Sequence, residues 1–457
     1  MALSAGESFM NEPTILVFGG GPAGAAVAIG LIRLGYQVTV IAKPRPFDAI
    51  EGISNRVVEG MRGAGFSLAL NEIAEPSPRH ATWGGQTVAA NTEHLIWRSQ
   101  FDKALLLDLK NHGAEVIEGR VRNHSRDGSR YTVAVELENG DATNLQGDFI
   151  VDARGRTAPS AHVTRRKGPQ TVSLLQPWHG PPICPRSAVE SFADGWAWMA
   201  TRSDGQRYLQ LTLDATSSRL PAKKHLNQWF RQELGGLRKA SSFIEGSEPV
   251  AEPYGRTSTA VLCKSNIGDS WIRVGDAAMA VDPLSGNGMF QALSSALQAP
   301  AVINTLLKCP ERSELAKQFY ETRIETLFYR FARIGRDFYD SENQWSISPF
   351  WQSRRKWPDA QPVHARVRPN EVVTAFRPVV NNGCIEEKEV VVTPDFPLGI
   401  WHLNEVPLAR LLNAVRAEPH RSPDLVLIEI LGHEKGKWIA FWMEKQGWIG
   451  NVRTNSS

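Results

Sequence analysis

The chain has 457 residues, of which 42% are hydrophobic and 22% charged, and its formal net charge is +3. This size and composition suit a globular protein of two or three domains, and the small net charge gives no argument for nucleic-acid binding. The four cysteines form no C-x-x-C pair, so we expect neither a zinc site nor a redox dithiol motif. Without a signal-peptide pattern or a membrane-length apolar run, we expect a cytoplasmic protein without a bound metal.

Residues 14–42 are expected to form a strand, a glycine-rich turn, a helix and a second strand. TILVF is a continuous apolar run, which is typical of a parallel strand buried on both faces. The helix that follows GGGPAG is rich in small and apolar residues and is expected to end at Gly35, before the strand QVTVIA. This pattern predicts a βαβ unit at the start of the fold.

The remainder of the first half alternates between these two kinds of element. A helix over 101–112 precedes the candidate strands AEVIEG, YTVAVEL and FIVDA. From 170 to 262 the pattern is rich in strands, and we expect Val189–Met199 and Arg207–Asp214 to form a hairpin. The buried strand in SWIRVGDA then returns to the first domain.

The second half is expected to be mostly helical. The helix after Gly288 contains Pro300, where we expect a kink or a break. An amphipathic helix follows over 311–343, and the Pro-, Trp- and Arg-rich segment 346–370 resembles a linker. The tail predicts a small domain with a strand in EVVVTPDF, a helix in VPLARLLNAVRAE and a strand in KWIAFWMEK.

The first motif that indicates chemistry is GGGPAG, with Gly19, Gly21 and Gly24 in G-x-G-x-x-G spacing. Its glycines permit a tight turn, approach of a pyrophosphate and close packing of helix on strand. The acidic residue that usually grips the ribose is replaced by Ala42 and Lys43. Glu51 is a candidate substitute, although a surface-loop glutamate explains it equally well.

The second motif is GDAAMAVDPLSGNGM, residues 275–289. Asp276 can accept a hydrogen bond from a ribityl hydroxyl, and the turn from Pro283 to Gly288 can present amides to the pyrimidine edge of a flavin ring. The helix that begins near Gly288 supplies positive potential, which favours anionic reduced flavin. The two glycine motifs together therefore predict one FAD molecule held at both ends.

These motifs resemble those of the FAD-dependent aromatic hydroxylases and tryptophan halogenases. WRSQFD resembles an R-x-x-F/L-D element, which makes Arg98 a flavin-phosphate contact by resemblance, and VDARGR resembles the family's middle motif. The resemblance implies an α/β fold with a Rossmann-like FAD-binding domain of the para-hydroxybenzoate hydroxylase type, a β-sheet substrate domain and a small C-terminal α+β domain. The expected cofactor-binding residues are Gly19, Gly21, Pro22, Ala23, Gly24, Lys43, Arg98, Gly275, Asp276, Pro283, Gly286, Asn287, Gly288 and Met289.

The expected FAD-binding domain is discontinuous and comprises 12–165 and 264–345. The substrate domain is expected over 166–263 and a small C-terminal domain over 372–457. The amphipathic helix LARLLNAVRAE of that domain is a candidate for docking a partner, although covering the domain's own small core explains it equally well.

GRDFYDSENQW, PFWQSRR and the appended tail are most similar to the flavoproteins of tryptophylquinone biogenesis. This resemblance implies a monooxygenase that uses FAD, O2 and NAD(P)H or another external reductant. Its substrate would be a tryptophan in a partner polypeptide, such as a small amine dehydrogenase subunit that matures to cysteine tryptophylquinone. Hydroxylation of a free aromatic compound, halogenation and a non-catalytic role as a maturation chaperone are the alternatives.

Two features bear on these alternatives. The halogenase motif W-x-W-x-I-P is reduced here to GWAWMAT, and EPSPRHATWGG offers no catalytic lysine, which argues against halogenation. Trp83, Trp196 and Trp198 are candidates for stacking on an aromatic substrate, but packing in a sheet explains them as well. Indole is itself a good carbon nucleophile, so we assign no catalytic acid or base; His80 is a candidate proton relay, or a structural histidine.

Overall fold

The computed structural model describes residues 12–43, 45, 48–159, 163–217 and 220–450. The chain divides into two compact units. The first comprises Met1–Asn304 and Tyr320–Gln361, and the second Thr305–Phe319 and Pro362–Ser457.

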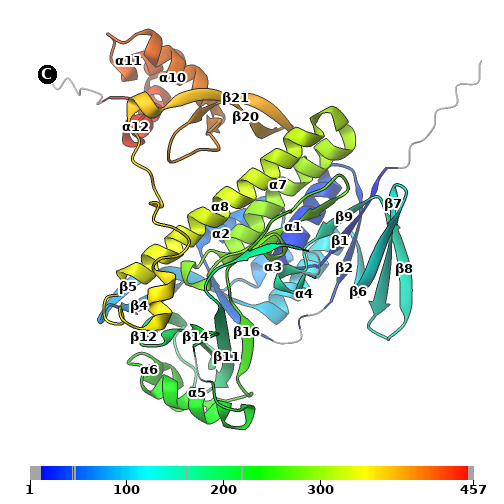
Figure 1. Cartoon of the computed structure of the whole chain (residues 1–457), viewed down its shortest axis with the longest axis vertical. Helices are drawn as coiled ribbons and strands as arrows, with labels where there is room; N and C mark the ends of the chain where they lie inside the picture. The colour runs from blue at the N-terminus through cyan, green and yellow to red at the C-terminus, as the bar shows by residue number, and fades with distance from the viewer. Residues whose placement is uncertain (1–11, 44, 46–47, 160–162, 218–219, 451–457) are drawn as a thin grey trace, which may run out of the picture. The chain divides into compact units, whose positions relative to one another are not determined.

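A seven-stranded sheet forms the first layer of unit 1, in the order β18-β9-β1-β2-β6-β7-β8 (Figure 1). Its five strands from β18 to β6 are parallel, and β7 and β8 extend it as antiparallel neighbours. The apolar run in β1 is buried, as strands covered on both faces require. Its strands are β1 (Thr14–Phe18), β2 (Gln37–Ala42), β6 (Glu115–Asp127), β7 (Arg130–Leu137), β8 (Ala142–Gly147), β9 (Phe149–Asp152) and β18 (Trp271–Arg273).

A nine-stranded sheet forms the second layer, in the order β15-β11-β14-β13-β12-β4-β5-β3, with β16 also paired to β11. Residues before position 166 therefore contribute three strands to the sheet that we expected from 166–263 alone. Helices α5 (Leu226–Gly235) and α6 (Ala240–Ile244) cover one of its faces through an apolar core. Its strands are β3 (Ile50–Ile53), β4 (Ser77–Trp83), β5 (Gln86–Trp97), β11 (Thr171–His179), β12 (Arg186–Phe192), β13 (Gly195–Thr201), β14 (Gln206–Asp214), β15 (Glu248–Pro249) and β16 (Tyr254–Thr257).

A short three-stranded sheet and several helices complete unit 1. The strands are β10 (Arg165–Lys167), β17 (Val261–Cys263) and β19 (Met279–Ala280). The helices are α1 (Pro22–Arg33), α2 (Asn55–Ala64), α3 (Leu68–Asn71), α4 (Arg98–Asn111), α7 (Gly288–Lys308), α8 (Ser313–Ser341) and α9 (Pro349–Arg354), with α7 and α8 each crossing the unit boundary.

Unit 2 has its own apolar core, built around Leu408, Leu412, Ile439 and Met443. Its hairpin pairs β20 (Val373–Asn381) with β21 (Cys384–Val392), and β22 (His402–Leu403) pairs with β23 (Val406–Pro407). Its helices are α10 (Leu408–Ala417), α11 (Pro423–Leu431) and α12 (His433–Lys445).

The structure corrects four of the expected elements. The expected strand Val189–Met199 is divided into β12 and β13, which pair antiparallel with each other. Helix α7 continues through Pro300, whose ring packs where Gly30 of α1 leaves room for it. The expected linker 346–370 contains the buried helix α9. KWIAFWMEK is helical, because Ile439, Ala440 and Met443 bury one helical face.

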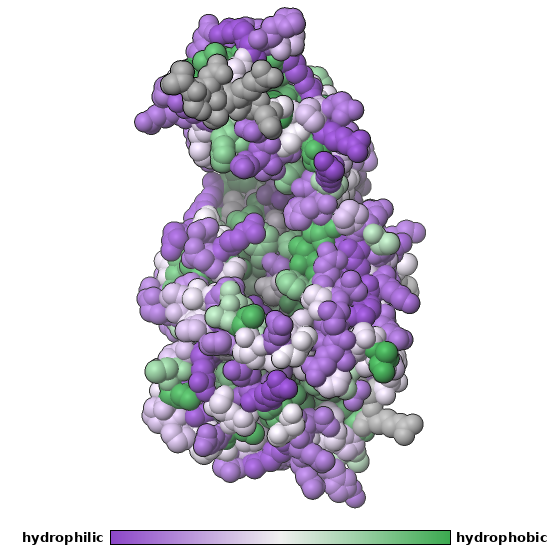
Figure 2. Space-filling view, turned by 90° about the vertical axis from the view of Figure 1, so that its left-hand side faces the viewer, coloured by the Kyte–Doolittle hydropathy of each residue, from purple (hydrophilic) through white to green (hydrophobic). Residues whose placement is uncertain are grey.

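The surface shown in Figure 2 is mainly hydrophilic, with hydrophobic residues gathered in small separate patches. Within the described residues, no helix is long and apolar enough to cross a membrane.

Candidate active site

The turn between β1 and α1 depends on its glycines. Gly19 has a φ of +111°, a backbone conformation that favours glycine. A Cβ atom on Gly24 would lie 1.9 Å from the carbonyl oxygen of Gly19, whereas a Cβ on Gly21 would meet nothing within 4 Å. Open space therefore lies over Gly21 at the start of α1, where unpaired amides and the helix dipole attract phosphate.

The two glycine motifs meet in space although they are far apart in the sequence. Pro22 begins α1, and a Cβ on Gly275 would lie 2.8 Å from the Cβ of Ala23 in the first turn of that helix. The amide of Gly275 donates to Ser295 Oγ at 2.8 Å, which fixes this segment to helix α7. The structure thus joins both motifs into one surface.

Asp276 follows directly and is held by a basic side chain. Its carboxylate pairs with Arg156 Nε at 3.2 Å. Desolvation raises the pKa of Asp276, and the charge of Arg156 opposes that shift. Arg156 belongs to the VDARGR motif, so the middle motif and the second glycine motif also meet here.

The turn before α7 is preorganised by its own hydrogen bonds. Asp282 accepts from the amide of Leu284 at 2.9 Å and thereby caps the short turn that Pro283 begins. Asn287 Nδ2 donates to the carbonyl of Ser285 at 2.6 Å. A Cβ on Gly286 or on Gly288 would meet nothing within 4 Å, and Met289 beside them is half-buried.

These observations fit a flavin dinucleotide. Close contacts require glycine at Gly24, against the backbone of Gly19, and at Gly275, against the side chain of Ala23, whereas open space lies over Gly21, Gly286 and Gly288. A ligand can therefore approach the backbone at both motifs without displacing protein atoms. Asp276 lies on the surface that joins them and can accept a hydroxyl hydrogen.

The expected phosphate and ribose contacts near β2 have other partners. The guanidinium of Arg98 donates to both oxygens of Glu51 at 3.0 Å and to Asp102 Oδ1 at 2.7 Å. Burial alone would lower the pKa of Arg98, but these carboxylates raise it above its ordinary value. Glu51 is thus engaged by Arg98, and Lys43 is exposed just beyond the end of β2.

The three candidate tryptophans differ in their surroundings. Trp83 Nε1 donates to the carbonyl of Phe338 at 3.1 Å, and its ring meets Trp351 edge-on. Trp196 is only 3% exposed and donates to Tyr339 Oη at 3.2 Å. Trp198 is half-buried, and its indole nitrogen has no hydrogen-bond partner in the described part of the chain. Of the three, Trp198 therefore has both ring surface and a polar atom left for a ligand.

A buried chain of hydrogen bonds connects the turn that begins at Asp282 to the second sheet, and sequence reasoning missed it. Tyr339 of α8 donates to Asp282 Oδ1 at 3.0 Å and accepts from Trp196 of β13. Burial raises the pKa values of Asp282 and Tyr339, and the amide of Leu284 opposes the shift at Asp282. Tyr339 lies in the GRDFYDSENQW stretch, but nothing local in the sequence indicates its partner.

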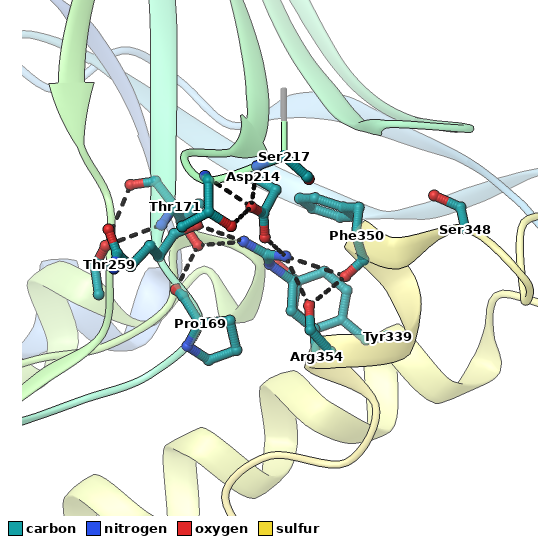
Figure 3. A network of polar contacts seen from close by, with 12 residues as sticks. Pro169, Thr171, Asp214, Ser217, Thr259, Tyr339, Ser348, Phe350 and Arg354 are labelled. Carbon is teal, nitrogen blue, oxygen red and sulfur yellow. Dashed lines mark hydrogen bonds and ion pairs between the residues drawn. The ribbon is translucent and has the colours of Figure 1, made fainter. Parts of the chain in front are cut away.

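Arg354 forms a second buried network beside this chain (Figure 3). Its guanidinium donates to Asp214 Oδ2 at 3.0 Å and to Thr171 Oγ1 at 2.7 Å. Arg354 also stacks over the ring of Phe350, with 3.9 Å between its Cζ and the ring centroid. Asp282, Tyr339 and Arg354 line one small cavity. The segment expected to be a linker therefore supplies an arginine that binds the second sheet and lines a cavity with Asp282.

Comparisons with known proteins agree with this arrangement. The sequence model of the FAD binding domain family matches residues 12–231. The chain is 27% identical to a tryptophan 2-halogenase of Chondromyces crocatus, an alignment that covers 76% of this chain and 71% of that protein. It is 24% identical to the putative FAD-dependent oxidoreductase LodB of Marinomonas mediterranea, across 76% of this chain and 97% of that protein. The solved structure of the flavin-dependent halogenase CmlS, 18% identical, superposes with a TM-score of 0.77 over 96% of each chain, which shows a shared fold.

Fold, glycine motifs and relatives together define the class: the chain belongs to the FAD-dependent hydroxylases and halogenases of the para-hydroxybenzoate hydroxylase type. It is an FAD-dependent oxidoreductase of the monooxygenase kind. Within this class it is similar to the solved structure of QhpG, described as a peptidyl tryptophan dihydroxylase essential for tryptophylquinone cofactor biogenesis. The two sequences are 48% identical over 96% of this chain and 100% of the other, with a TM-score of 0.83.

Proposed function

We propose that this enzyme hydroxylates a tryptophan side chain in a partner polypeptide during biogenesis of cysteine tryptophylquinone. The observation that carries the proposal is the 48% identity to QhpG along almost the whole of both chains. The proposed partner is a small amine dehydrogenase subunit, and the proposed co-substrates are O2 and NAD(P)H or another external reductant.

The roles of the site residues follow from their places in the fold. We propose that Gly19, Gly21, Pro22, Ala23 and Gly24 hold the pyrophosphate of FAD, while Lys43 and Arg98 contribute positive charge beside it. Asp276 would accept from a ribityl hydroxyl. The amides from Gly286 to Met289 would face the pyrimidine edge of the ring at the start of α7.

The chemistry divides between the cofactor and the protein. Reduced FAD, when bound, activates O2 and supplies the oxygen atom that adds to the aromatic ring. The side chains orient the indole, exclude water and hold the turn from Asp282 to Gly288 in place. Indole carbon atoms are nucleophilic without deprotonation, so this proposal assigns no catalytic base.

The small C-terminal domain is the proposed docking site for the partner polypeptide. Residues 372–457 lie within unit 2, which has its own apolar core. Its helix α12 exposes Trp438 and Phe441, with exposed fractions of 44% and 57%. Aromatic side chains exposed in this way are typical anchors of protein interfaces.

Mass spectrometry of the partner tests the proposal. The candidate partner subunit is expressed with and without this chain and digested, and each tryptophan peptide is weighed. We expect one tryptophan to gain oxygen only in the presence of this chain. An unchanged partner, together with fast hydroxylation of free small indoles, would favour the free-substrate alternative. A partner that matures normally with a variant unable to bind FAD would favour the chaperone alternative.

A further inference from the structure

Two neighbouring residues interrupt the buried centre of the second sheet. Strands β13 and β14 pair antiparallel, and Trp198 lies directly opposite Gln210 in this register. Trp198 and Gln210 are both partly exposed, whereas all the remaining residues of Gly195–Thr201 and of Arg207–Asp214 are buried. On these two stretches the facing pair is therefore the partly exposed place, and we call its surface the opening.

The opening lies on the face of the sheet that turns toward the flavin motifs. Side chains alternate along a strand, so Trp198 shares its face with Trp196, which is linked through Tyr339 to Asp282. On β14, Gln210 shares its face with Asp214, the partner of Arg354. The opposite face is closed by the core that α5 and α6 cover.

The amide of Gln210 is oriented by a chain of hydroxyl groups. Gln210 Nε2 donates to Thr212 Oγ1 at 2.9 Å. Thr212 Oγ1 bonds to Ser173 Oγ at 3.1 Å, and Ser173 Oγ bonds to Ser258 Oγ at 2.7 Å. Thr212 accepts from the amide, and either hydroxyl of each later pair can donate, so the three hydroxyl groups form one connected chain behind Gln210.

This arrangement leaves the carbonyl oxygen of Gln210 as an acceptor. Among the described residues, no donor bonds to Oε1, whereas Nε2 is engaged by Thr212 Oγ1. Beside it, Trp198 presents an aromatic surface whose other side meets Tyr208 edge-on at 6.2 Å between ring centroids. The opening thus combines a flat apolar wall with one acceptor.

An indole matches this combination, because it has a flat apolar ring and a single N–H donor. We infer that Trp198 and Gln210 form the recognition site for the substrate indole, with Gln210 Oε1 accepting from the indole N1–H and Trp198 packing along the ring. This inference rests on the proposed function and adds the residues that select a tryptophan. A site built to accept a hydrogen bond discriminates against a ligand without the donor, because its oxygen is then buried without a partner.

The test compares two peptides that differ only in this donor. One is a short peptide of the partner sequence around its target tryptophan; in the other, benzothienylalanine replaces the tryptophan, so that sulfur stands in place of N–H. Binding of each to the FAD-loaded full chain is measured by calorimetry. We expect the tryptophan peptide to bind about tenfold more tightly, as one unsatisfied buried acceptor implies.

Variants on β14 test whether Gln210 causes the preference for the tryptophan peptide. Gln210→Met should bind the two peptides equally. Gln206→Met, the same change at the first residue of β14, should keep the preference for the tryptophan peptide. Thr212→Val removes the hydroxyl that accepts from the amide of Gln210 and should reduce the preference for the tryptophan peptide. This variant keeps the test usable if Gln210→Met no longer binds FAD. Trp198→Ala should weaken the binding of both peptides by the same factor.

The results separate this inference from the proposed function. Equal binding of the two peptides by the unaltered enzyme, or an unchanged preference in Gln210→Met, overturns the inference even if the partner is hydroxylated. A tenfold preference that disappears in Gln210→Met supports the site even if mass spectrometry finds no oxygen on the partner, in which case the proposed function alone fails.

Discussion

Tyr339 donates a hydrogen bond of 3.0 Å to Asp282, and this contact joins the end of helix α8 to the turn that starts α7. Asp282 also caps that turn through the amide of Leu284, so the same carboxylate oxygen fixes the turn and receives the phenol. The turn beside the proposed flavin ring is therefore held from outside as well as by its own backbone.

We predict that Tyr339→Phe lowers FAD affinity about fivefold. The variant keeps the ring but leaves Asp282 and Trp196 without their shared partner, and the net contribution of one hydrogen bond is about 1 kcal/mol. Tyr329→Phe on the same helix is the matched control, because the buried hydroxyl of Tyr329 has no hydrogen-bond partner among the residues that the structure describes. Fluorescence titration of the apoprotein with FAD measures both. Equal affinities in the two variants would show that the contact does not support the site.

The glycines of the first motif should separate folding from cofactor binding. In Gly24→Ala the added methyl group would lie 1.9 Å from the Gly19 carbonyl oxygen, so the β1–α1 turn must open and the protein should lose several kcal/mol of stability. In Gly21→Ala the methyl group enters open space, so the apoprotein should melt at an unchanged temperature. Its FAD affinity should still fall at least tenfold, because the methyl group would lie where the pyrophosphate approaches the backbone. Thermal melts with and without FAD measure both effects; tight FAD binding by Gly21→Ala would place the phosphates elsewhere.

The sequence predicted the parts of the site that local geometry determines. The spacing of GGGPAG and of GDAAMAVDPLSGNGM predicted tight turns, and the two motifs meet where Gly275 lies against Ala23. The contacts of Tyr339 with Asp282 and of Arg354 with Asp214 span 57 and 140 residues, and no local pattern specifies them. KWIAFWMEK was misassigned because a short apolar run fits a strand or a helix until its packing partner is known.

The buried pair of Arg354 and Asp214 should make stability depend on pH in acid. Burial disfavours the carboxylate, but the hydroxyl and amide of Thr216 and the guanidinium of Arg354 outweigh it and lower the pKa of Asp214 to about 2 from its ordinary 3.8. Because the folded pKa is depressed, this stabilisation is complete above about pH 4 and is lost as pH falls toward 2.

We predict that Asp214→Asn destabilises the protein by about 3 kcal/mol at pH 7, since it leaves Arg354 buried without a counter-charge. Between pH 4 and pH 2 the stability of the variant should fall less steeply than that of the unaltered protein. Urea unfolding at a series of pH values measures both slopes. Parallel slopes would assign the acid sensitivity to other carboxylates.

Cys309 and Cys384 should form a disulfide under oxidising conditions. The two thiols are hydrogen-bonded within unit 2, and the amide of Ile385 donates to Thr305 Oγ1 at 2.7 Å, which holds the hairpin turn against the end of α7. Burial raises the pKa of the Cys309 thiol above its ordinary 9.0, and the neighbouring Cys384 adds to this shift. Little thiolate is therefore present at neutral pH. Exchange with oxidised glutathione, which takes up the two electrons and two protons as two free thiols, should therefore be slow at pH 7 and faster above pH 9. Peptide mapping of the unaltered chain should find the 309–384 bond. In the control Cys309→Ser it should find only mixed disulfides with glutathione, as at the exposed Cys184. Glutathione retained on Cys309 in the unaltered chain would mean that the two thiols cannot reach bonding geometry.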